Sequence, residues 1–308
     1  MNSSQTNIEK PGLAGKYIGI FGKGGSGKST AIVLLAKGLR EHGYEVCVLD
    51  ADSTNVGLAR ALGIEMSPQP LMDYFGGMVF SGGAVTCPVD DPTPLVGREI
   101  SLDELPPQYI GTNHEGITLL VAGKIGNQGA GAGCDGPVSK IARDLRIKMQ
   151  GKAPVILVDF KAGFEDTARG VITGLDWALV LVDPTVAGIE MAVTMKDTIQ
   201  QIKNGKLPAT QHMKDLKLVE MANMIFAQAS IKGVLYVINK VSNEEIQSYL
   251  EEKLADKGIH PNGVIHEYPA INISWLKGVP IDVPQARDDI SNIVVQLELV
   301  EKAAEIQS

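Results

Sequence analysis

A glycine-rich segment near the start of the chain contains the residue types that bind phosphate groups. Residues 22–30 read GKGGSGKST. In loops of the pattern G-x-x-x-x-G-K-[ST], backbone N–H groups surround the phosphates of a nucleotide, the lysine contacts the β- and γ-phosphates, and the hydroxyl binds Mg²⁺. Lys28 and Ser29 occupy these two positions, and a second lysine, Lys23, directly follows the first glycine.

The segments on either side of this loop have the periodicity that such a loop requires. The apolar run Tyr17–Phe21 predicts a strand, and the spacing of apolar residues over 31–40 predicts a helix. A loop that joins a strand to a helix is the context in which this pattern binds nucleotide. The loop residues that we expect to contact the nucleotide are Gly24, Gly25, Ser26, Gly27, Lys28, Ser29 and Thr30.

Carboxylates end two further apolar runs. Asp159 ends the run PVILVD in the position of a Walker B aspartate, which binds Mg²⁺, and Gly163 follows where a backbone N–H can approach the γ-phosphate. Asp50 and Asp52 end the run VLDAD, and at the carboxyl end of a strand they face the crevice where α/β sheets bind ligands. We expect Asp50 to contact the Mg²⁺ shell and Asp52 to orient or deprotonate the attacking water. The alternatives are an aspartate that only ends a strand and a turn-forming Asp-x-Asp-Ser.

Apolar strands alternate with helices along the chain. The predicted strands cover residues 17–22, 44–50, 117–122, 154–159, 177–182, 233–239 and 263–268. The predicted helices cover residues 28–42, 137–150, 187–203, 243–257 and 285–304. Strands that are rich in Val, Ile and Leu and separated by helices indicate a parallel sheet buried on both faces. The predicted fold class is therefore α/β, a three-layer P-loop NTPase with a mostly parallel twisted sheet and helices on both faces.

We predict a single domain over residues 16–308, after a flexible tail at 1–15. Two segments interrupt the alternation of strands and helices. Residues 66–112 are rich in Pro and Gly and are too long for an ordinary connection, which indicates a flexible cap or a partner-facing insertion. Residues 204–232 contain the sequence HMKDLKLVEMANMIF, which predicts an added helical segment at the sheet edge.

Composition and charge narrow the range of partners. Apolar residues make up 44% of the 308 residues, which supports a globular core, and 28 Lys and Arg against 36 Asp and Glu give a formal charge of −8. An acidic balance disfavours nucleic acid and anionic membranes as partners. The sequence shows neither a long apolar run nor a signal peptide, and its three cysteines, Cys47, Cys87 and Cys134, are too few for a disulfide framework. We therefore predict a cytoplasmic protein.

Taken together, these motifs resemble those of the deviant Walker A ATPases. This group contains MinD, ParA, the nitrogenase iron protein and CooC, the nickel-insertion ATPase of carbon monoxide dehydrogenase. The resemblance runs from about residue 16 to residue 282, and its most specific parts are the sequences KGGSGKST, DAD, DFKAG and VDPT. It implies a dimeric molecular switch that binds ATP and Mg²⁺ and hydrolyses the ATP.

The resemblance also implies roles for residues outside the phosphate loop pattern. In this family the extra lysine, here Lys23, reaches across a homodimer to the partner's phosphates, so that ATP becomes part of the interface. Asn239, followed by Lys240, matches the asparagine that reads the adenine, a role that suits an amide because it both donates and accepts hydrogen bonds. By the same analogy, the Tyr-Pro-Ala sequence at 268–270 lies near the base.

Within this group, the chain resembles CooC most. The sequence GAGCDGP at 131–137 is similar to the CooC metal loop, Gly-x-Gly-Cys-x-Cys-Pro, but Gly136 stands in place of the second cysteine. Two Cys134 thiols that meet at a dimer axis offer a site for a soft ion such as Ni²⁺ or Zn²⁺. The alternative is a thiol without a metal in a dimer-facing loop. Cys87 can join Cys134 only if the 66–112 segment folds back, and Lys161 stands where the CooC pattern has an acidic residue.

Three functions follow from these patterns. The favoured one is a switch that assists metallocentre assembly in a client metalloenzyme, such as nickel insertion into a carbon monoxide dehydrogenase-like enzyme. The second is a MinD- or ParA-like positioning or partition ATPase. A MinD-like protein needs a basic amphipathic helix at its end, whereas the basic residues of 282–308 are only Arg287 and Lys302. The third is a nucleotide-gated adaptor that hydrolyses ATP slowly.

Overall fold

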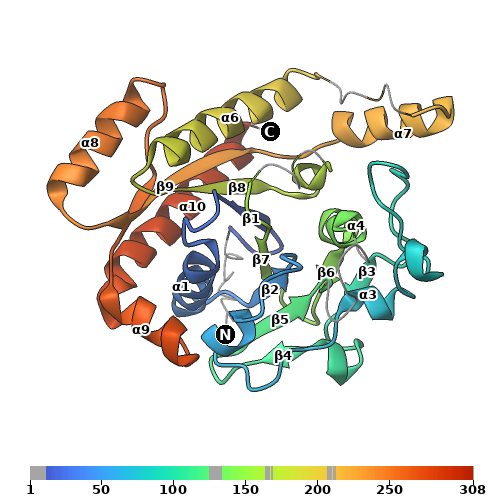
Figure 1. Ribbon diagram of the computed structural model, residues 1–308, viewed down its shortest axis with the longest axis horizontal. Helices are drawn as coiled ribbons and strands as arrows, with labels where there is room; N and C mark the ends of the chain where they lie inside the picture. The colour runs from blue at the N-terminus through green and yellow to red at the C-terminus, as the bar shows by residue number, and fades with distance from the viewer. Residues whose placement is uncertain are drawn as a thin grey trace, which may run out of the picture.

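A parallel sheet forms the centre of the molecule (Figure 1). The computed structural model describes residues 12–307 apart from 125–133, 164–166, 168, 207–209, 211 and 212. These residues form an eight-stranded sheet in which every neighbouring pair is parallel except β4, which runs antiparallel to β5. In spatial order the strands are β10 (Gly263–His266), β9 (Gly233–Val241), β8 (Trp177–Val182), β1 (Tyr17–Phe21), β7 (Val155–Asp159), β2 (Val46–Asp50), β5 (Ile117–Val121) and β4 (Gly111–Thr112).

Helices cover both faces of this sheet, and a small second sheet lies beside it. The second sheet pairs β3 (Glu99–Ser101) with β6 (Arg146–Lys148) in parallel. The α-helices are α1 (Lys28–Glu41), α2 (Leu58–Ala61), α3 (Leu71–Tyr74), α4 (Gly136–Asp144), α6 (Val186–Lys203), α7 (Leu216–Ala227), α8 (Glu244–Ala255), α9 (Pro269–Lys277) and α10 (Arg287–Gln307). Short 3-10 helices are η1 (Val79–Ser81), η2 (Pro107–Tyr109), η3 (Val171–Gly174) and η4 (Pro284–Ala286).

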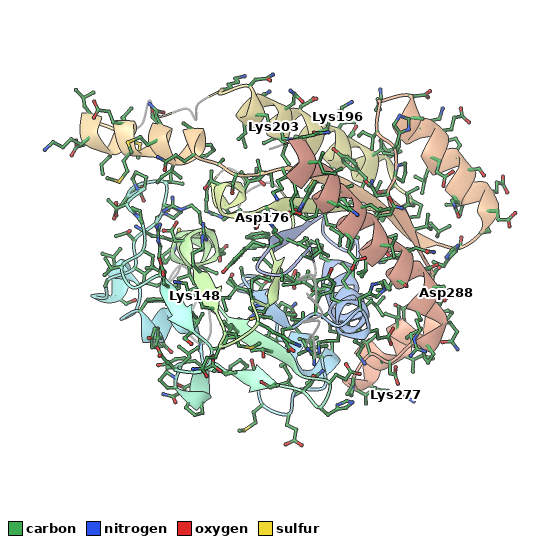
Figure 2. The ribbon with its side chains drawn as sticks, turned by 180° about the vertical axis from the view of Figure 1, so that it is seen from behind. Lys148, Asp176, Lys196, Lys203, Lys277 and Asp288 are labelled. Atoms are coloured by element: carbon green, nitrogen blue, oxygen red, sulfur yellow. The ribbon has the colours of Figure 1, made fainter. Side chains whose placement is uncertain are left out.

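Two hydrophobic cores lie on opposite faces of the sheet. Along β1, Ile18 belongs to the core beneath α1, α2, α9 and α10, whereas Phe21 belongs to the core beneath α3, α4, α6 and α8. This division follows from the alternation of side chains along a strand, and it requires strands that are apolar on both sides. The structure confirms the three-layer α/β architecture expected from the sequence. At the amino-terminal end of β1, Asp176 accepts a hydrogen bond from the N–H of Tyr17 at 2.8 Å, near the middle of Figure 2.

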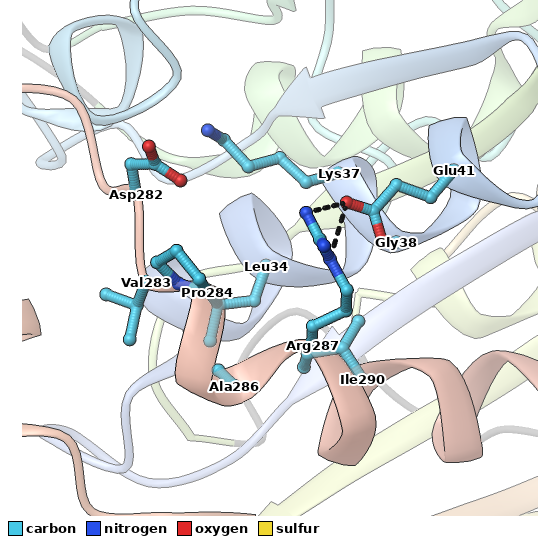
Figure 3. A pocket seen from close by; sticks show the side chains of 10 residues that line it. All are labelled: Leu34, Lys37, Gly38, Glu41, Asp282, Val283, Pro284, Ala286, Arg287 and Ile290. Atoms are coloured by element: carbon cyan, nitrogen blue, oxygen red, sulfur yellow. Dashed lines mark hydrogen bonds and ion pairs between the residues drawn. The ribbon is translucent and has the colours of Figure 1, made fainter.

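Helices α1 and α10 pack closely because a glycine lies between them. A Cβ atom at Gly38 would lie only 2.4 Å from Cγ2 of Ile290, so a larger residue would separate the helices. Beside this contact, a hollow of about 50 Å³ lies between α1 and η4, and the ion pair of Arg287 with Glu41, at 3.1 Å, lies on its wall (Figure 3). The hollow is a seam between two packed helices.

The predicted helix over 137–150 is wrong in its second half. Helix α4 ends at Asp144 because Leu145 adopts an extended conformation, with ψ at 132°. The next three residues form β6, which pairs with β3 from the 66–112 segment. A pairing between segments so far apart leaves no periodic signal in either sequence. The prediction also lacked α9, which begins at Pro269, a favourable first residue of a helix, and ends before Gly278 in the left-handed conformation.

The 66–112 segment forms part of the core instead of a separate cap. It contains α3, η1, β3, η2 and β4, and its apolar side chains pack into the core on the α4 side of the sheet. The buried core residues that it contributes are Leu71, Met72, Met78, Val85, Leu95, Ile100, Leu102 and Leu105. In the 204–232 segment, α7 projects beyond the end of α6 at the upper right of Figure 1, and Phe226 packs over Gly170.

Candidate functional site

The phosphate loop follows β1 at the carboxyl edge of the sheet, between β7 and β8. Gly25 and Gly27 adopt left-handed backbone conformations, with φ at 78° and 93°, which glycine tolerates without strain. The buried ammonium of Lys28 bends back over the loop and donates to the carbonyls of Gly22 at 3.2 Å and Lys23 at 3.4 Å. The loop leads directly into the N-terminus of α1. At this end of a helix, the first backbone N–H groups and the helix dipole favour an anion.

Two carboxylates lie side by side next to the loop because β2 and β7 are neighbours. Their parallel register places Asp50 opposite Asp159. Ser29 Oγ donates to Asp159 Oδ2 at 3.0 Å, and Asn55 Nδ2 donates to the same oxygen at 3.2 Å. Asp159 Oδ1 is buried and has no hydrogen-bond partner among the described residues. Asn55 was not expected from the sequence, although it lies only three residues after Asp52.

The protonation of these carboxylates depends on their burial. Burial and, after it, the charge of Asp50 raise the pKa of Asp159 to about 7, against the opposing hydrogen bond from Ser29. Burial also raises the pKa of Asp50 to about 6, although Lys124 opposes this increase. Ser29 and Asp159 form an oxygen donor set that fits Mg²⁺, a hard cation that prefers carboxylate and hydroxyl oxygens. A cation here would also provide a partner, directly or through its bound waters, for Asp159 Oδ1, which has none among the described residues.

Lys124 is a residue of this site that the sequence interpretation did not identify. Its ammonium donates to Asp50 Oδ2 at 2.6 Å and to the carbonyl of Asp52 at 2.6 Å. Asp50 is therefore paired with a lysine in this structure, and its contact with the Mg²⁺ shell stays a prediction. Lys124 follows β5, the neighbour of β2, so the rule that strand ends meet at one edge could have found it.

Asp52 lies at the same edge in a turn. Its Oδ1 accepts hydrogen bonds from the backbone N–H of Thr54 at 2.9 Å and from the hydroxyl of Thr54 at 2.6 Å. Its own N–H donates to Asp50 Oδ1 at 3.1 Å. The turn that the sequence allowed is thus present, and it holds a partly exposed carboxylate beside the phosphate loop.

Lys23 forms an ion pair within its own chain. Its Nζ lies 2.9 Å from Oδ2 of Asp183, which follows β8, and the Lys23 side chain is 29% exposed. Asp183 belongs to the VDPT sequence, for which the sequence suggested no individual role. A partly exposed pair of this kind is weak enough to exchange partners.

The opposite end of the loop adjoins a pocket of about 200 Å³. The buried amide of Asn239 donates to the carbonyl of Ser26 at 2.6 Å, and Lys240 donates to the carbonyl of Gly25 at 2.7 Å. Trp275 Nε1 donates to the Thr30 hydroxyl at 2.8 Å. The pocket lining is Gly27, Thr30, Asn239, Lys240, Ile265, His266, Glu267, Tyr268, Ile271, Asn272 and Trp275. The structure thus brings Asn239, Lys240 and Tyr268 together as the sequence suggested, and it adds Trp275.

The Cys134 turn contacts both nucleotide-side loops through Asp135. Ser53 Oγ donates to Asp135 Oδ1 at 2.5 Å, and Lys161 Nζ donates to Asp135 Oδ2 at 2.7 Å. Ser53 directly follows Asp52, and Lys161 lies two residues after Asp159. The residues 131–133 of the expected metal loop lie outside the described part of the chain, but Cys134 is described and is partly exposed. Lys161 therefore links the nucleotide site to the Cys134 turn.

Comparison with known proteins agrees with this geometry. Residues 20–281 match the CbiA family, described as the CobQ/CobB/MinD/ParA nucleotide binding domain. The chain belongs to this family. An uncharacterized ATP-binding protein of Methanocaldococcus jannaschii is 30% identical over 245 residues, which cover 79% of this chain and 85% of that protein. The carbon monoxide dehydrogenase accessory protein CooC of Rhodospirillum rubrum is 28% identical over 180 residues, which cover 58% of this chain and 67% of CooC.

Solved structures show the same fold. The cell division ATPase MinD of Pyrococcus furiosus superposes with a TM-score of 0.56 at 17% identity, over 93% of this chain and 99% of MinD. MinD of Pyrococcus horikoshii, solved as a complex with Mg-ADP, gives a TM-score of 0.56 at 17% identity, over 95% of this chain and 98% of that one. These similarities confirm a MinD-like P-loop NTPase fold. Within the described part of the chain, no helix has both the length and the apolar character needed to cross a bilayer.

Proposed function

We propose that this protein binds Mg-ATP and hydrolyses it as a dimeric molecular switch. The observation that carries this proposal is the buried cluster beside the phosphate loop, in which the Ser29 hydroxyl bonds to Asp159 and Asp159 Oδ1 has no partner among the described residues. Ser29 and Asp159 would hold Mg²⁺ directly or through its waters. When bound, the ion neutralises phosphate charge as phosphoryl transfer proceeds.

The chain's own residues supply positioning and charge. Lys28 donates to two loop carbonyls, at 3.2 Å and 3.4 Å, and we propose that its ammonium exchanges these contacts for phosphate oxygens when nucleotide binds. Asp52 lies beside the loop and is partly exposed, which suits a carboxylate that orients the attacking water or accepts its proton. Asn239 and Lys240, at the end of β9, would contact the base from the neighbouring pocket.

A second subunit would complete the site through Lys23. In the single chain Lys23 pairs with Asp183, and both side chains lie at the loop. We propose that ATP binding exchanges this pair for a contact between Lys23 and the phosphates of a partner subunit. Dimer opening after hydrolysis would then release a partner protein.

The client that we propose is a metalloenzyme, with a soft metal ion such as Ni²⁺ or Zn²⁺ carried at Cys134 as cargo. The similarity to CooC, whose name describes a carbon monoxide dehydrogenase accessory protein, supports a role in metallocentre assembly. The partly exposed thiol in a turn that contacts both nucleotide-side loops supports it independently. We place this function in the cytoplasm, as the sequence predicts.

The test is steady-state and single-turnover hydrolysis of ATP, beside light scattering with and without ATP. Lys28→Ala and Asp52→Ala should each lower turnover by about 100-fold or more, because they remove charge at the reacting phosphate or water. Lys23→Ala should abolish ATP-dependent dimerisation. Lys37→Ala is the matched control, because Lys37 lies on α1 and pairs with Glu115 away from the loop. Wild-type turnover in both Lys28→Ala and Asp52→Ala would exclude the proposed hydrolysis, and dimerisation without hydrolysis would favour an adaptor.

A further inference from the structure

Cys87 and Cys134 meet at a single glycine. The N–H of Gly136 donates to Cys134 Sγ at 3.3 Å. A Cβ atom on the same residue would lie only 2.4 Å from Cys87 Sγ and 2.8 Å from Cys87 Cβ. Both sulfurs therefore lie at one backbone unit, and position 136 leaves no room for a side chain. This arrangement exists because the 66–112 segment folds back onto the start of α4.

Backbone N–H groups are directed at both sulfurs. Burial, the largest effect, raises the pKa of Cys87, and hydrogen bonds from the backbone N–H groups of Val89 and Asp90 oppose this increase. Cys134 Sγ accepts a hydrogen bond from the backbone N–H of Gly136. Outer donors of this kind orient the ligands in metal sites. A bound cation would offset the burial of the negative charge on Cys87.

We propose that Cys87 and Cys134 of one chain are two thiolate ligands of a soft metal ion. Thiolates select ions such as Zn²⁺ or Cu⁺ over Mg²⁺, and the two S–H protons leave as the two metal–sulfur bonds form. Among the described residues, no group of three or more His, Cys, Asp or Glu side chains is placed to hold a metal ion. A site with two protein ligands keeps coordination positions open, which suits an exchangeable cargo better than a structural ion.

This inference deepens the proposed function, because it completes the metal site within one chain instead of at a dimer axis. The partly exposed Cys134 gives the ion a route from solvent, and the buried Cys87 lies behind it. The two arrangements differ in stoichiometry. A site within one chain binds one ion per chain, and a site made of two Cys134 thiols binds one ion per two chains.

The test is titration of the reduced, nucleotide-free, full-length protein with Cd²⁺ alone, followed by the ultraviolet thiolate-to-Cd²⁺ charge-transfer band. We expect one Cd²⁺ per chain. Cys87→Ser and Cys134→Ser should each weaken Cd²⁺ binding by about 100-fold. The loss of a direct ligand should lower the affinity at least as much as the loss of an outer-sphere partner does. Cys47→Ala is the control, because it removes the remaining thiol, which is buried in β2, and should retain the site. One Cd²⁺ per two chains, unchanged by Cys87→Ser, would overturn the proposal, as would no charge-transfer band in the wild-type protein.

A second measurement needs no variant. A trivalent arsenical such as phenylarsine oxide binds tightly only where two thiols are neighbours, so it should bind the wild-type protein in a ratio of one per chain. Weak binding, reversed by a monothiol, would contradict a thiol pair. ATP hydrolysis is measured on the same samples, so the two proposals fail separately. Wild-type protein that hydrolyses ATP but binds no Cd²⁺ would overturn the metal site, and wild-type protein that binds Cd²⁺ but does not hydrolyse ATP would overturn the switch.

Discussion

The nucleotide site and the thiol pair lie close together, but different features of the fold hold them in place. Asp50 and Asp159 are the last residues of parallel strands, and Lys28 begins the helix after the loop that follows β1. The backbone register of β2 with β7 sets Asp50 opposite Asp159. Cys87 and Cys134 lie outside the strands, so backbone pairing between strands does not position them. They meet because a loop packs on Gly136, at a contact with no room for a side chain.

The two sites therefore tolerate different substitutions. A side chain on the strand edge can be altered while the backbone hydrogen bonds keep its neighbours in place, so chemistry can be lost without loss of fold. The thiol pair depends on close packing, so an added carbon atom disturbs its geometry directly. Asp135 joins the two regions, because it accepts from Ser53 and Lys161 and lies next to Cys134.

The largest effect should come from Asp159→Asn. We expect hydrolysis to fall by about 100-fold or more, because the amide cannot replace a charged Mg²⁺ ligand. The nucleotide-free protein should nevertheless gain stability at pH 8, by about 2–6 °C in Tm, since a fully buried carboxylate with a pKa near 7 is ionised there at a cost. Calorimetry and an ATPase assay check both results. A lower Tm at pH 8 would contradict the expectation that the buried charge of Asp159 destabilises the nucleotide-free protein.

The next effect is the pH dependence of Mg²⁺ binding. Asp159 must lose its proton to bind the ion, so apparent Mg²⁺ affinity should rise about 10-fold between pH 6 and pH 8, as the pKa of about 7 requires. The pKa of Asp159 is raised in the folded state. The contribution of this carboxyl group to folding stability is therefore present at low pH and is lost as the pH rises towards 7. Asp159→Asn should remove this pH dependence. Mg²⁺ titrations followed by nucleotide fluorescence measure it, and a flat wild-type profile would contradict it.

A several-fold effect is expected for Asp135→Asn, which tests the link between the two regions. The neutral amide keeps the size of Asp135 but weakens the ion pair with Lys161. Hydrolysis should change by about 3–10-fold, within the range of a lost charge-assisted hydrogen bond. In the wild-type protein, ATP should alter the rate at which a maleimide modifies Cys134, because Asp135 links the Cys134 turn to Ser53 and Lys161. In Asp135→Asn, ATP should leave this rate unchanged. Glu99→Gln is the control, because it weakens the exposed pair with Lys148 far from both sites. If ATP changes the maleimide rate of Cys134 equally in Asp135→Asn and in the wild-type protein, Asp135 does not connect the nucleotide site to the thiol pair.

The smallest effect on activity should come from Gly136→Ala. The added methyl would collide with Cys87, so the loop must move, at a cost of about 1–3 kcal/mol in the free energy of unfolding. We expect weaker Cd²⁺ binding with hydrolysis close to normal. Gly12→Ala is the matched control, because the nearest atom to a new Cβ there lies 4.0 Å away. Equal stability of the two variants in denaturant titrations would mean that the thiol contact is loose.

The elements and the nucleotide site were predictable to different degrees. The longer strands of the main sheet could be predicted because a strand buried on both faces is continuously apolar, as in β7 and β8. Short strands could not be predicted, because the two residues of β4 and the three residues of β6 carry no period. The partner of β6 also lies far away in the chain, in the 66–112 segment. The partners of charged site residues, Lys124 for Asp50 and Asp183 for Lys23, were also missed. Each follows a strand end, but only the spatial order of the strands identifies which ends are neighbours.

The phosphate loop between a strand and a helix can be recognised from the amino-acid sequence, because the glycines, Lys28 and Ser29 act through local backbone geometry. The carboxylates at the strand ends can be recognised in the same way, since apolar runs and their last residues are adjacent in the chain. The pairing of Asp50 with Lys124 and the contact of Cys87 and Cys134 at Gly136 depend on the three-dimensional fold. These contacts join segments far apart in the chain, and the packing of loops against the sheet brings them together.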